Sequence, residues 1–425
     1  MTFLTQLKVK SKPFKELNKK SNYKKNKMMK QLKVYLLGLI IILSFSCSAP
    51  KFMQQGTLGS QNFFKEIPFQ YSNGLIIITA EIQSKQYNFA LDSGAEVNAF
   101  DESIASEINF KMLKKIKVNS TTTSKKGQTI GAIPKISIDG VEFNNTTAVF
   151  MDLSGFSKVM GCIPLHGLIG NNVMRKAHWQ IDYQRQIVRV TDDFSKLKTS
   201  KNSSRLKMNA GTHGNIYLNL KIAETNLKCT FDTGYGGKFQ VNKMELLKDF
   251  PHTTLEGTHG MNASGIVKGE KSYALVSEFF VEDIPLQNQK IIFAKNNSAL
   301  IGNKFWEHFI LTIDWKNDVL ILDPKTELEN DDLEFFELTI IPDFDKEIIE
   351  IKKRIKGNEN HKDVPMGAQV LKVNEYDVSN FTENELCDFW KITWEEIKKE
   401  KALTLMILHD NKEKAIVINK VNAAN

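Results

Sequence analysis

The sequence has few residues of the kinds that build metal centres and disulfide frameworks. Its 425 residues include only 4 cysteines and 8 histidines. The cysteines lack Cys-x-x-Cys spacing, and the histidines lack His-Glu-x-x-His or any other paired metal-ligand spacing. A Gly-x-Ser-x-Gly elbow and a phosphate-binding loop are also absent. These absences argue against zinc hydrolases, α/β-hydrolases and P-loop nucleotidases. We interpret Cys162, Cys229 and Cys387 as small buried hydrophobic residues.

Positive charge is scarce outside the N-terminus. The chain has a formal net charge of +8, but residues 1–33 alone contain eleven lysines and one glutamate. Residues 47–425 have a net charge of −2. No basic surface for nucleic acid is therefore indicated, and we expect no nucleic-acid partner.

The apolar run near the N-terminus is too short to span a membrane. Residues 34–45 form an uncharged run of 12 residues, whereas a membrane-spanning helix needs about 20. The run follows Lys30 and Lys33, as the apolar core of a secretory signal does. It ends at Cys47, and residues 1–46 resemble a bacterial lipoprotein signal whose cleavage would leave Cys47 to receive the lipid. The alternative is an ordinary cleaved signal with an incidental cysteine.

Two further observations concern this leader. Translation starting at Met28 or Met29 would leave a shorter signal. The residues after Cys47 carry no acidic cluster, which favours a lipid-anchored protein that faces the periplasm.

An internal repeat organises the middle of the chain. Residues 75–92 and 215–232 align with a constant offset of 140. Each copy reads as an apolar strand with alternating polarity, a polar turn and a second strand. Each therefore predicts a hairpin whose second strand ends at an aspartate, Asp92 or Asp232.

A second pair of segments continues the repeat. Residues 168–183 and 300–315 align with an offset of 132, and both contain Leu-Ile-Gly-Asn followed by Ile-Asp. Two homologous halves of this length indicate an intramolecular pseudo-dimer, and we expect a monomer.

Each repeated hairpin ends in an Asp-Ser/Thr-Gly tripeptide, and the chain has no others. These are Asp92-Ser93-Gly94 and Asp232-Thr233-Gly234. One copy would be weak evidence, because Asp-x-Gly is ordinary turn composition. Two copies at matching repeat positions resemble aspartic proteases, and more narrowly bacterial retropepsin-like and pepsin-like enzymes with two fused lobes and a C-terminal PDZ-like domain. The resemblance implies that Asp92 and Asp232 are the catalytic dyad and that Gly170 and Gly302 pack beneath their loops.

The residue types suit hydrolysis of an amide by water. Two carboxyl groups about 3 Å apart cannot both ionise easily, so they share one proton and supply base and acid together. The hydroxyls of Ser93 and Thr233 can hydrogen-bond across the lobe interface. Gly94 and Gly234 have no Cβ, so their backbone can approach a carboxylate and donate an N–H to it. No metal or organic cofactor is expected.

Several details remain open at this level. Tyr235 follows the second motif where a small residue is usual, so it either crowds the site or shapes a substrate pocket. A mobile hairpin that covers the substrate could lie in residues 127–134 or 257–269, although ordinary surface turns explain these glycines equally well.

The last hundred residues predict a further small domain. Residues 327–334 are acidic and read as a solvated linker. Thr382 and Glu385 form a capping box for one helix, whose apolar face includes Leu386 and Ile392. Residues 367–374 resemble a PDZ stretch, but no carboxylate-binding Gly-Leu-Gly-Phe loop is visible. The domain therefore either captures peptides by strand addition or serves as a structural cap.

The sequence thus predicts a mainly β protein with two pseudo-symmetric acid-protease β-barrel lobes and a small α+β PDZ-like domain. We expect an exported aspartic endopeptidase acting on peptides or proteins, lipid-anchored in the cell envelope of a Gram-negative-type bacterium. The alternative is a non-catalytic peptide-binding envelope lipoprotein. The expected boundaries are 1–46 for the signal, 47–66 for a tether, 67–197 and 198–326 for the two lobes, and 327–425 for the PDZ-like domain.

Overall fold

The computed structural model describes residues 51–116, 128–154, 162–211, 214–262, 265–295 and 297–422. The expected signal peptide and Cys47 lie outside these residues. The chain divides into the units Met1–Lys51 and Phe52–Asn425, and both lobes and the C-terminal residues belong to the second. In the described part of the chain, no helix has the length and apolar character needed to cross a membrane.

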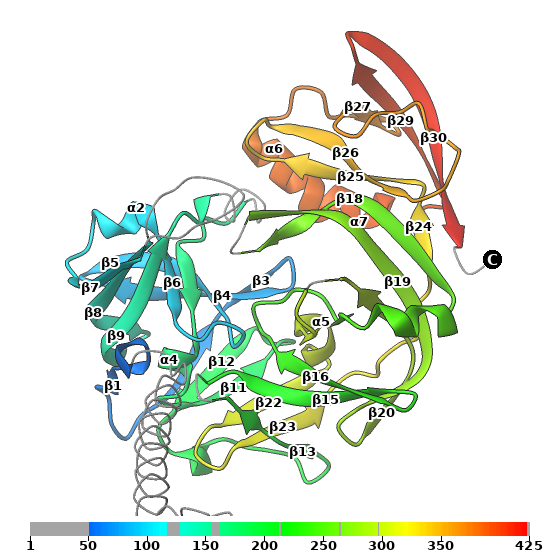
Figure 1. Cartoon of the computed structure of the whole chain (residues 1–425). Coiled ribbons are helices and arrows are strands. Elements are labelled where there is room, and N and C mark those ends of the chain that lie inside the picture. The colour runs from blue at the N-terminus through cyan, green and yellow to red at the C-terminus, as the bar shows by residue number, and fades with distance from the viewer. Residues whose placement is uncertain are drawn as a thin grey trace, which may run out of the picture. The chain divides into compact units, whose positions relative to one another are not determined.

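The first lobe is a closed six-stranded barrel, as the alternating strands predict (Figure 1). Its central hairpin pairs Ile77 with Ala90 and turns at Gln83 and Ser84, whose positive φ angles of 53° and 64° suit a tight hairpin turn. Its elements, with the short β1 beside them, are β1 (Thr57–Leu58), β3 (Gln70–Ser72), β4 (Leu75–Ile82), β5 (Lys85–Leu91), β6 (Asn98–Asp101), α2 (Glu102–Ala105), β7 (Lys111–Ile116), β8 (Gln128–Ile138), β9 (Val141–Met151), β10 (Gly167–Ile169) and α4 (Asn171–Met174).

The second lobe repeats this barrel. Its central hairpin pairs Tyr217 with Thr230 and ends at Phe231, one residue before Asp232. Its elements are β14 (Asn209–Ala210), β15 (Ile216–Ile222), β16 (Thr225–Phe231), β17 (Phe239–Val241), β18 (His252–Asn262), β19 (Gly265–Val281), β20 (Ile284–Phe293), β21 (Leu300–Ile301) and α5 (Asn303–Trp306).

A six-stranded antiparallel sheet joins the two lobes. Its strand order is β13-β23-β22-β11-β12-β2, so that each lobe contributes three strands. The central contact pairs Gln180 with Thr312, which are equivalent residues of the repeat, and the Gln180 amide donates to the Thr312 hydroxyl at 2.8 Å. The strands are β2 (Phe64–Pro68), β11 (His178–Asp182), β12 (Ile187–Thr191), β13 (Ser204–Lys207), β22 (Phe309–Asp314) and β23 (Val319–Pro324).

The apolar cores follow this division. One continuous cluster of buried side chains fills both barrels and the shared sheet, and it includes the fully buried Trp179 and Trp306. A second cluster fills the C-terminal residues and centres on Ile349, Leu386 and Leu405. Because the two lobes share one core, neither lobe could bury its apolar surface alone.

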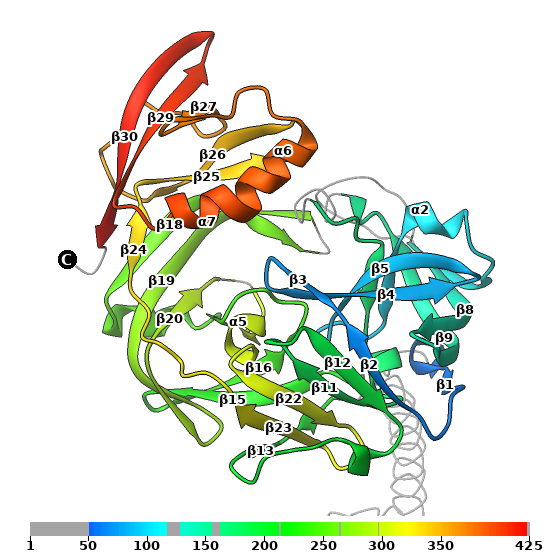
Figure 2. The ribbon, with the colours of Figure 1, turned by 180° about the vertical axis from the view of Figure 1, so that it is seen from behind.

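Residues 334–422, here called the C-terminal module, combine strands with one helical segment (Figures 1 and 2). The predicted capping box is present, since the Glu385 N–H donates to the Thr382 hydroxyl and the Glu385 carboxylate accepts from the Thr382 N–H. The elements are β24 (Glu334–Phe336), β25 (Leu338–Asp343), β26 (Ile348–Ile355), β27 (Gln369–Val373), β28 (Tyr376–Asp377), α6 (Glu383–Asp388), a π-helical turn (Phe389–Thr393), α7 (Trp394–Ile397), β29 (Ala402–His409) and β30 (Lys412–Asn422).

The π-helical turn corrects one expectation about this helix. Ile392 was expected on the apolar face, but it is 68% exposed, whereas Leu386 is buried as expected. A π turn inserts one extra residue into the helix and rotates the residues that follow it away from the 3.6-residue pattern.

The linker before the module is exposed at Glu327, Glu329, Asn330 and Asp332, as expected, but it is anchored at Asp331 and Leu333. The Asp331 carboxylate accepts hydrogen bonds from the Lys238 ammonium at 2.9 Å and from the Lys290 N–H at 2.8 Å. Leu333 is only 1% exposed. These contacts attach the linker to the second lobe, close to the Asp232 loop.

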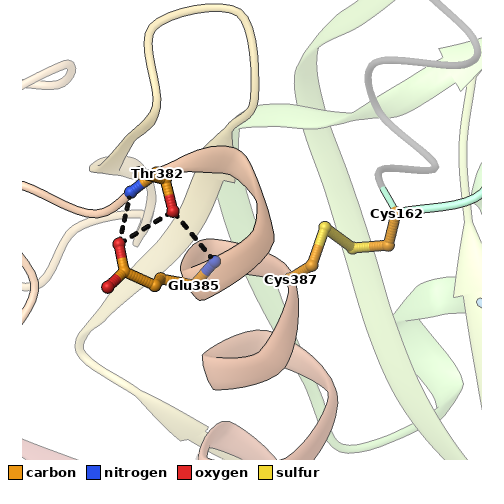
Figure 3. Close-up of a disulfide and its surroundings, with 4 residues drawn as sticks. All are labelled: Cys162, Thr382, Glu385 and Cys387. Atoms are coloured by element: carbon orange, nitrogen blue, oxygen red, sulfur yellow. Dashed lines mark hydrogen bonds between the residues drawn. A yellow bond between two sulfur atoms is a disulfide. The ribbon is translucent and has the colours of Figure 1, made fainter.

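The C-terminal module is joined to both lobes. Strand β26 pairs with β18 of the second lobe, matching Leu255 with Ile355 and Gly257 with Lys353. A disulfide connects Cys162 of the first lobe to Cys387 in α6 (Figure 3). The interpretation of all three cysteines as small hydrophobic residues is therefore wrong for this pair, while Cys229 is free and buried.

Candidate active site

The Asp92 loop is held between two strands of the first lobe. Strand β5 ends at Leu91 and runs parallel to β10, where the Ile169 carbonyl accepts from the Asp92 N–H at 3.0 Å. The chain then turns back, so that one Asp92 carboxylate oxygen accepts from the N–H groups of Gly94 and Ala95 at 2.8 and 2.9 Å. The turn thus fixes both the backbone and the carboxylate of Asp92.

The Asp232 loop repeats this geometry in the second lobe. Strand β16 ends at Phe231 and pairs with β21, where the Ile301 carbonyl accepts from the Asp232 N–H at 3.0 Å. The Gly234 N–H donates to the Asp232 carboxylate at 2.8 Å. The repeat recognised in the sequence therefore produces two equivalent turns, each presenting a carboxylate.

Ser93 and Thr233 join the two turns as their hydroxyl chemistry predicts. The Ser93 N–H donates to the Thr233 hydroxyl at 2.9 Å, and the Thr233 N–H donates to the Ser93 hydroxyl at 3.0 Å. Each hydroxyl also donates to a carbonyl of the opposite lobe at 2.9 Å, that of Phe231 or Leu91. Both side chains are fully buried, so water cannot compete for these four bonds.

The two carboxyl groups meet between the turns. A Cβ atom placed on Gly94 would lie 2.6 Å from the Asp232 Cγ atom, and one placed on Gly234 would lie 2.3 Å from the Asp92 Cγ atom. Each glycine is therefore required by the aspartate of the opposite lobe. The two side chains are therefore close enough to interact electrostatically, and the charge of Asp92 acts on Asp232.

The electrostatics of the pair favour a single shared proton. Burial raises the pKa of Asp92, although the N–H groups of Ala95 and Gly94 act in the opposite direction. Burial, followed by the negative charge of Asp92, raises the pKa of Asp232 well above its ordinary value. The pKa values of both groups are raised and the pair titrates as a unit, and both side chains remain partly exposed.

Gly170 and Gly302 lie beneath the two turns, where the resemblance places them. A Cβ atom on Gly170 would lie 2.7 Å from the carbonyl carbon of Val97, and one on Gly302 would lie 2.3 Å from the Tyr235 carbonyl oxygen. Any larger residue at either position would push the turn, and its aspartate, out of place.

Asn171 and Asn303 support the turns, although no role was predicted for them. Each amide nitrogen donates at 2.6 Å to a carbonyl of its own turn, that of Ser93 or Thr233. Each also reaches the other lobe, and the Asn303 amide donates to the Gly74 carbonyl at 2.7 Å. Both side chains are fully buried. Their equivalence under the 132-residue offset was the available signal.

Tyr235 does not project between the carboxyl groups. Its ring lies against its own loop, so that a Cβ atom on Gly237 would lie 2.3 Å from the ring, and one on Gly302 would lie 2.5 Å from it. Burial raises the pKa of the Tyr235 phenol, and the hydroxyl is buried without a hydrogen-bond partner in the described structure. The two glycines thus create the space that this larger residue needs.

The two candidate covering hairpins have different outcomes. Residues 128–134 lie within β8, on the second strand of the β7–β8 hairpin, and Gly127 is outside the described residues. Residues 257–269 form the end of the β18–β19 hairpin, where Asn262 pairs with Gly265. The second candidate is thus a hairpin end, and the C-terminal module borders it through β26.

Comparison with known proteins agrees with this geometry for the first lobe. Residues 78–173 match a family model described as aspartyl protease. The matched segment begins in β4 and ends in α4, so it contains the Asp92 loop and Gly170. No curated protein matches the chain. Asp232 lies beyond the matched residues and is related to the first lobe by the internal repeat. The comparison therefore identifies an aspartyl-protease-like segment at the residues that hold Asp92.

Proposed function

We propose that this protein is an aspartic endopeptidase whose catalytic pair is Asp92 and Asp232. One observation carries the proposal: two equivalent turns each place a carboxyl group against the glycine of the opposite turn, and four buried hydrogen bonds fix the turns to each other. In a pair held in this way, the charge of one carboxylate favours the protonated form of the other, so the pair can share one proton.

We assign the base to Asp92 and the acid to Asp232 because Asp92 accepts from two backbone N–H groups and Asp232 from one. The ionised Asp92 takes a proton from a water molecule as that water attacks the peptide carbonyl carbon, and the protonated Asp232 donates its proton to the carbonyl oxygen. The tetrahedral diol then collapses as a proton passes to the leaving amine, and the C–N bond breaks. Water is the nucleophile, so no covalent bond forms to the protein.

The backbone donors suit this assignment. Asp92 accepts from two N–H groups through one oxygen, which stabilises its ionised form and leaves its other oxygen for water. The side chain of Asp232 accepts from the Gly234 N–H and lies against Asp92. The asymmetry between the turns begins at Ala95 and Tyr235, where their sequences diverge.

The test is cleavage of a diverse peptide library by the purified protein from pH 3 to 8. The proposal expects cleavage with a bell-shaped pH dependence, because the rate requires one protonated and one ionised carboxyl group. A folded protein that binds peptides and cleaves none at any pH would instead be the peptide-binding protein kept as the alternative.

Export and lipid attachment at Cys47 are also part of the proposal. The short apolar run before Cys47 supports it, and the Cys162–Cys387 disulfide adds independent support because such bonds persist in oxidising compartments outside the cytoplasm. Metabolic labelling with a tagged fatty acid tests the attachment. Label should appear on the wild-type protein and be absent after Cys47→Ser, and label on both proteins would reject the site.

For the C-terminal module we propose the structural-cap role of a PDZ-like domain. The pairing of β26 with β18 supports it, because that edge of the module already receives a strand of the protein itself. Lys356 adds to the contact, since its N–H donates to the Thr254 carbonyl at 2.8 Å. Deletion of residues 334–422 should then lower stability and activity together, and a fully active truncated protein would reject the role.

A further inference from the structure

The junction between β18, β19 and β26 contains basic side chains on both of its faces, but only one face is neutralised. On the first face, Arg354 lies 3.8 Å from the Glu256 carboxylate, and Lys356 lies 2.8 Å from the Glu270 carboxylate. These residues occupy alternate positions of paired strands, so their side chains share a face.

The opposite face carries Lys271 and Lys353, with His259 beside them. Lys271 pairs in register with Leu255, and Lys353 pairs with Gly257, two residues further along β18. In the described structure neither lysine forms an ion pair with a carboxylate. Among the described residues, the Lys271 ammonium donates to the neutral Gln240 side chain, at 3.2 Å. Gln240 lies on β17, the strand that follows the Asp232 loop.

These three side chains are half-buried and close enough to repel one another. Burial, followed by the charge of Lys271, lowers the pKa of Lys353 to about 8. Burial, followed by the charge of Lys353, lowers the pKa of His259 to about 4. The His259 Nε2–H donates to the Gly269 carbonyl at 3.0 Å, while its Nδ1 atom is buried without a hydrogen-bond partner among the described residues.

A half-buried cation without a counter-charge is costly, and paired cations lie on the other face of the same strands. A bound carboxylate would reduce this cost, because its negative charge would lie beside both lysines and its two oxygens could accept their hydrogen bonds. The junction borders the β18–β19 hairpin, the second candidate cover of the proposed active site.

We propose that Lys271 and Lys353, with His259 beside them, form a carboxylate-binding site that selects acidic peptide segments. The carboxylate belongs to an Asp or Glu side chain or to a peptide C-terminus. That the acidic peptide is a substrate rests on the proposed function, whereas the site itself can be tested without cleavage.

The experiment measures peptide binding to the full-length Asp232→Asn protein by fluorescence anisotropy. The probes are a glutamate-rich extended peptide and its glutamine counterpart, each with a free and an amidated C-terminus. The glutamate peptide should bind at least about tenfold more tightly, as expected for charge-assisted hydrogen bonds. If only the peptides with a free C-terminus bind more tightly, the site is supported and binds terminal carboxylates. Equal binding of all four peptides overturns the proposal.

Three variants separate the site from general charge effects. Lys271→Met and Lys353→Met should abolish the preference, while Lys356→Met, which removes the same charge from the neutralised face, should keep it. Lys353→Met should also retain or raise the melting temperature, because it removes an uncompensated charge. A loss of binding in this variant would therefore not result from unfolding. A preference lost equally in Lys356→Met would overturn the proposal.

Failure of the site can be distinguished from failure of the proposed function. A protein that cleaves peptides but binds glutamate and glutamine peptides equally keeps the function and loses the site. A protein that cleaves nothing but prefers the glutamate peptide, with the preference lost in Lys353→Met, keeps the site and loses the function.

Discussion

Reduction of the Cys162–Cys387 disulfide should destabilise the protein by an amount set by the length of chain that it closes. The two cysteines are 225 residues apart, and the bond therefore restricts more than half of the unfolded chain. The chain-entropy relation gives a loss of about 5 kcal/mol for a loop of this length. For a unit of about 370 residues, Phe52–Asn425, this corresponds to a fall in melting temperature of about 7 °C.

Both ends of the bond are anchored in the folded protein, so the native structure should survive reduction. Close to Cys162, Leu165 is buried against Ile77 and Ala90, and the Asn88 side chain donates to the Pro164 carbonyl at 3.1 Å. The module remains paired to β18. The loss should thus arise mainly in the unfolded state.

The assay is thermal and urea unfolding of the wild-type protein and of the Cys162→Ser/Cys387→Ser variant, with Cys229→Ser as a matched control. Cys229 is buried and free, so its replacement tests for the loss of a core thiol alone. Thiol titration in denaturant must first show the disulfide in the wild-type protein. An unchanged melting temperature after complete loss of the bond would refute the reasoning.

Three further predictions concern the site. Asn303→Ala should destabilise the protein by about 1–3 kcal/mol in urea unfolding, because it leaves the buried carbonyls of Thr233 and Gly74 without a donor. The same variant should lower kcat more than it raises KM. An unaffected kcat would contradict the role of Asn303 in positioning the turn. Gly234→Ala should reduce kcat/KM for peptide cleavage at least about a hundredfold, because the added Cβ atom would displace Asp92. The circular dichroism spectrum should stay native. Activity close to that of the wild-type protein would show that the turns are more compliant than this geometry allows. The raised pKa values of Asp92 and Asp232 mean that the contribution of these groups to stability is present below pH about 4 and is lost as the pH rises through their pKa values in the folded protein. Asp232→Asn should therefore gain in melting temperature relative to the wild-type protein between pH 4 and 7. A difference in melting temperature that does not depend on pH would contradict the raised pKa values.

The sequence was sufficient where the chemistry repeats. The 140-residue offset predicted both hairpins and the positions of Asp92 and Asp232 at their ends, because alternating apolar residues and a duplicated motif are local signals. The hydroxyl chemistry of Ser93 and Thr233 predicted bonds across the lobe interface, and these bonds are present. Whether Asp92 and Asp232 are catalytic remains a prediction that only activity measurements test.

The sequence was insufficient to predict which segments far apart in the chain contact each other. Nothing local distinguishes Cys162 and Cys387 from the free Cys229, because the pairing depends on how the C-terminal module meets the first lobe. The pairing of β26 with β18 is equally non-local. The acidic composition predicted a solvated linker, but it could not predict the contact of Asp331 with Lys238, because that contact depends on the fold of the second barrel.

The most direct test of the account is whether Asp92 and Asp232 act as one catalytic unit. Peptide cleavage should be measured for Asp92→Asn, Asp232→Asn and the double variant, beside Asp139→Asn as a matched control. Asp139 is an exposed turn residue with a φ angle of 47°, which asparagine also adopts. The account predicts that each single variant loses as much activity as the double variant and that the control keeps it. Substantial cleavage by either single variant would contradict the account, because one carboxyl group would then suffice.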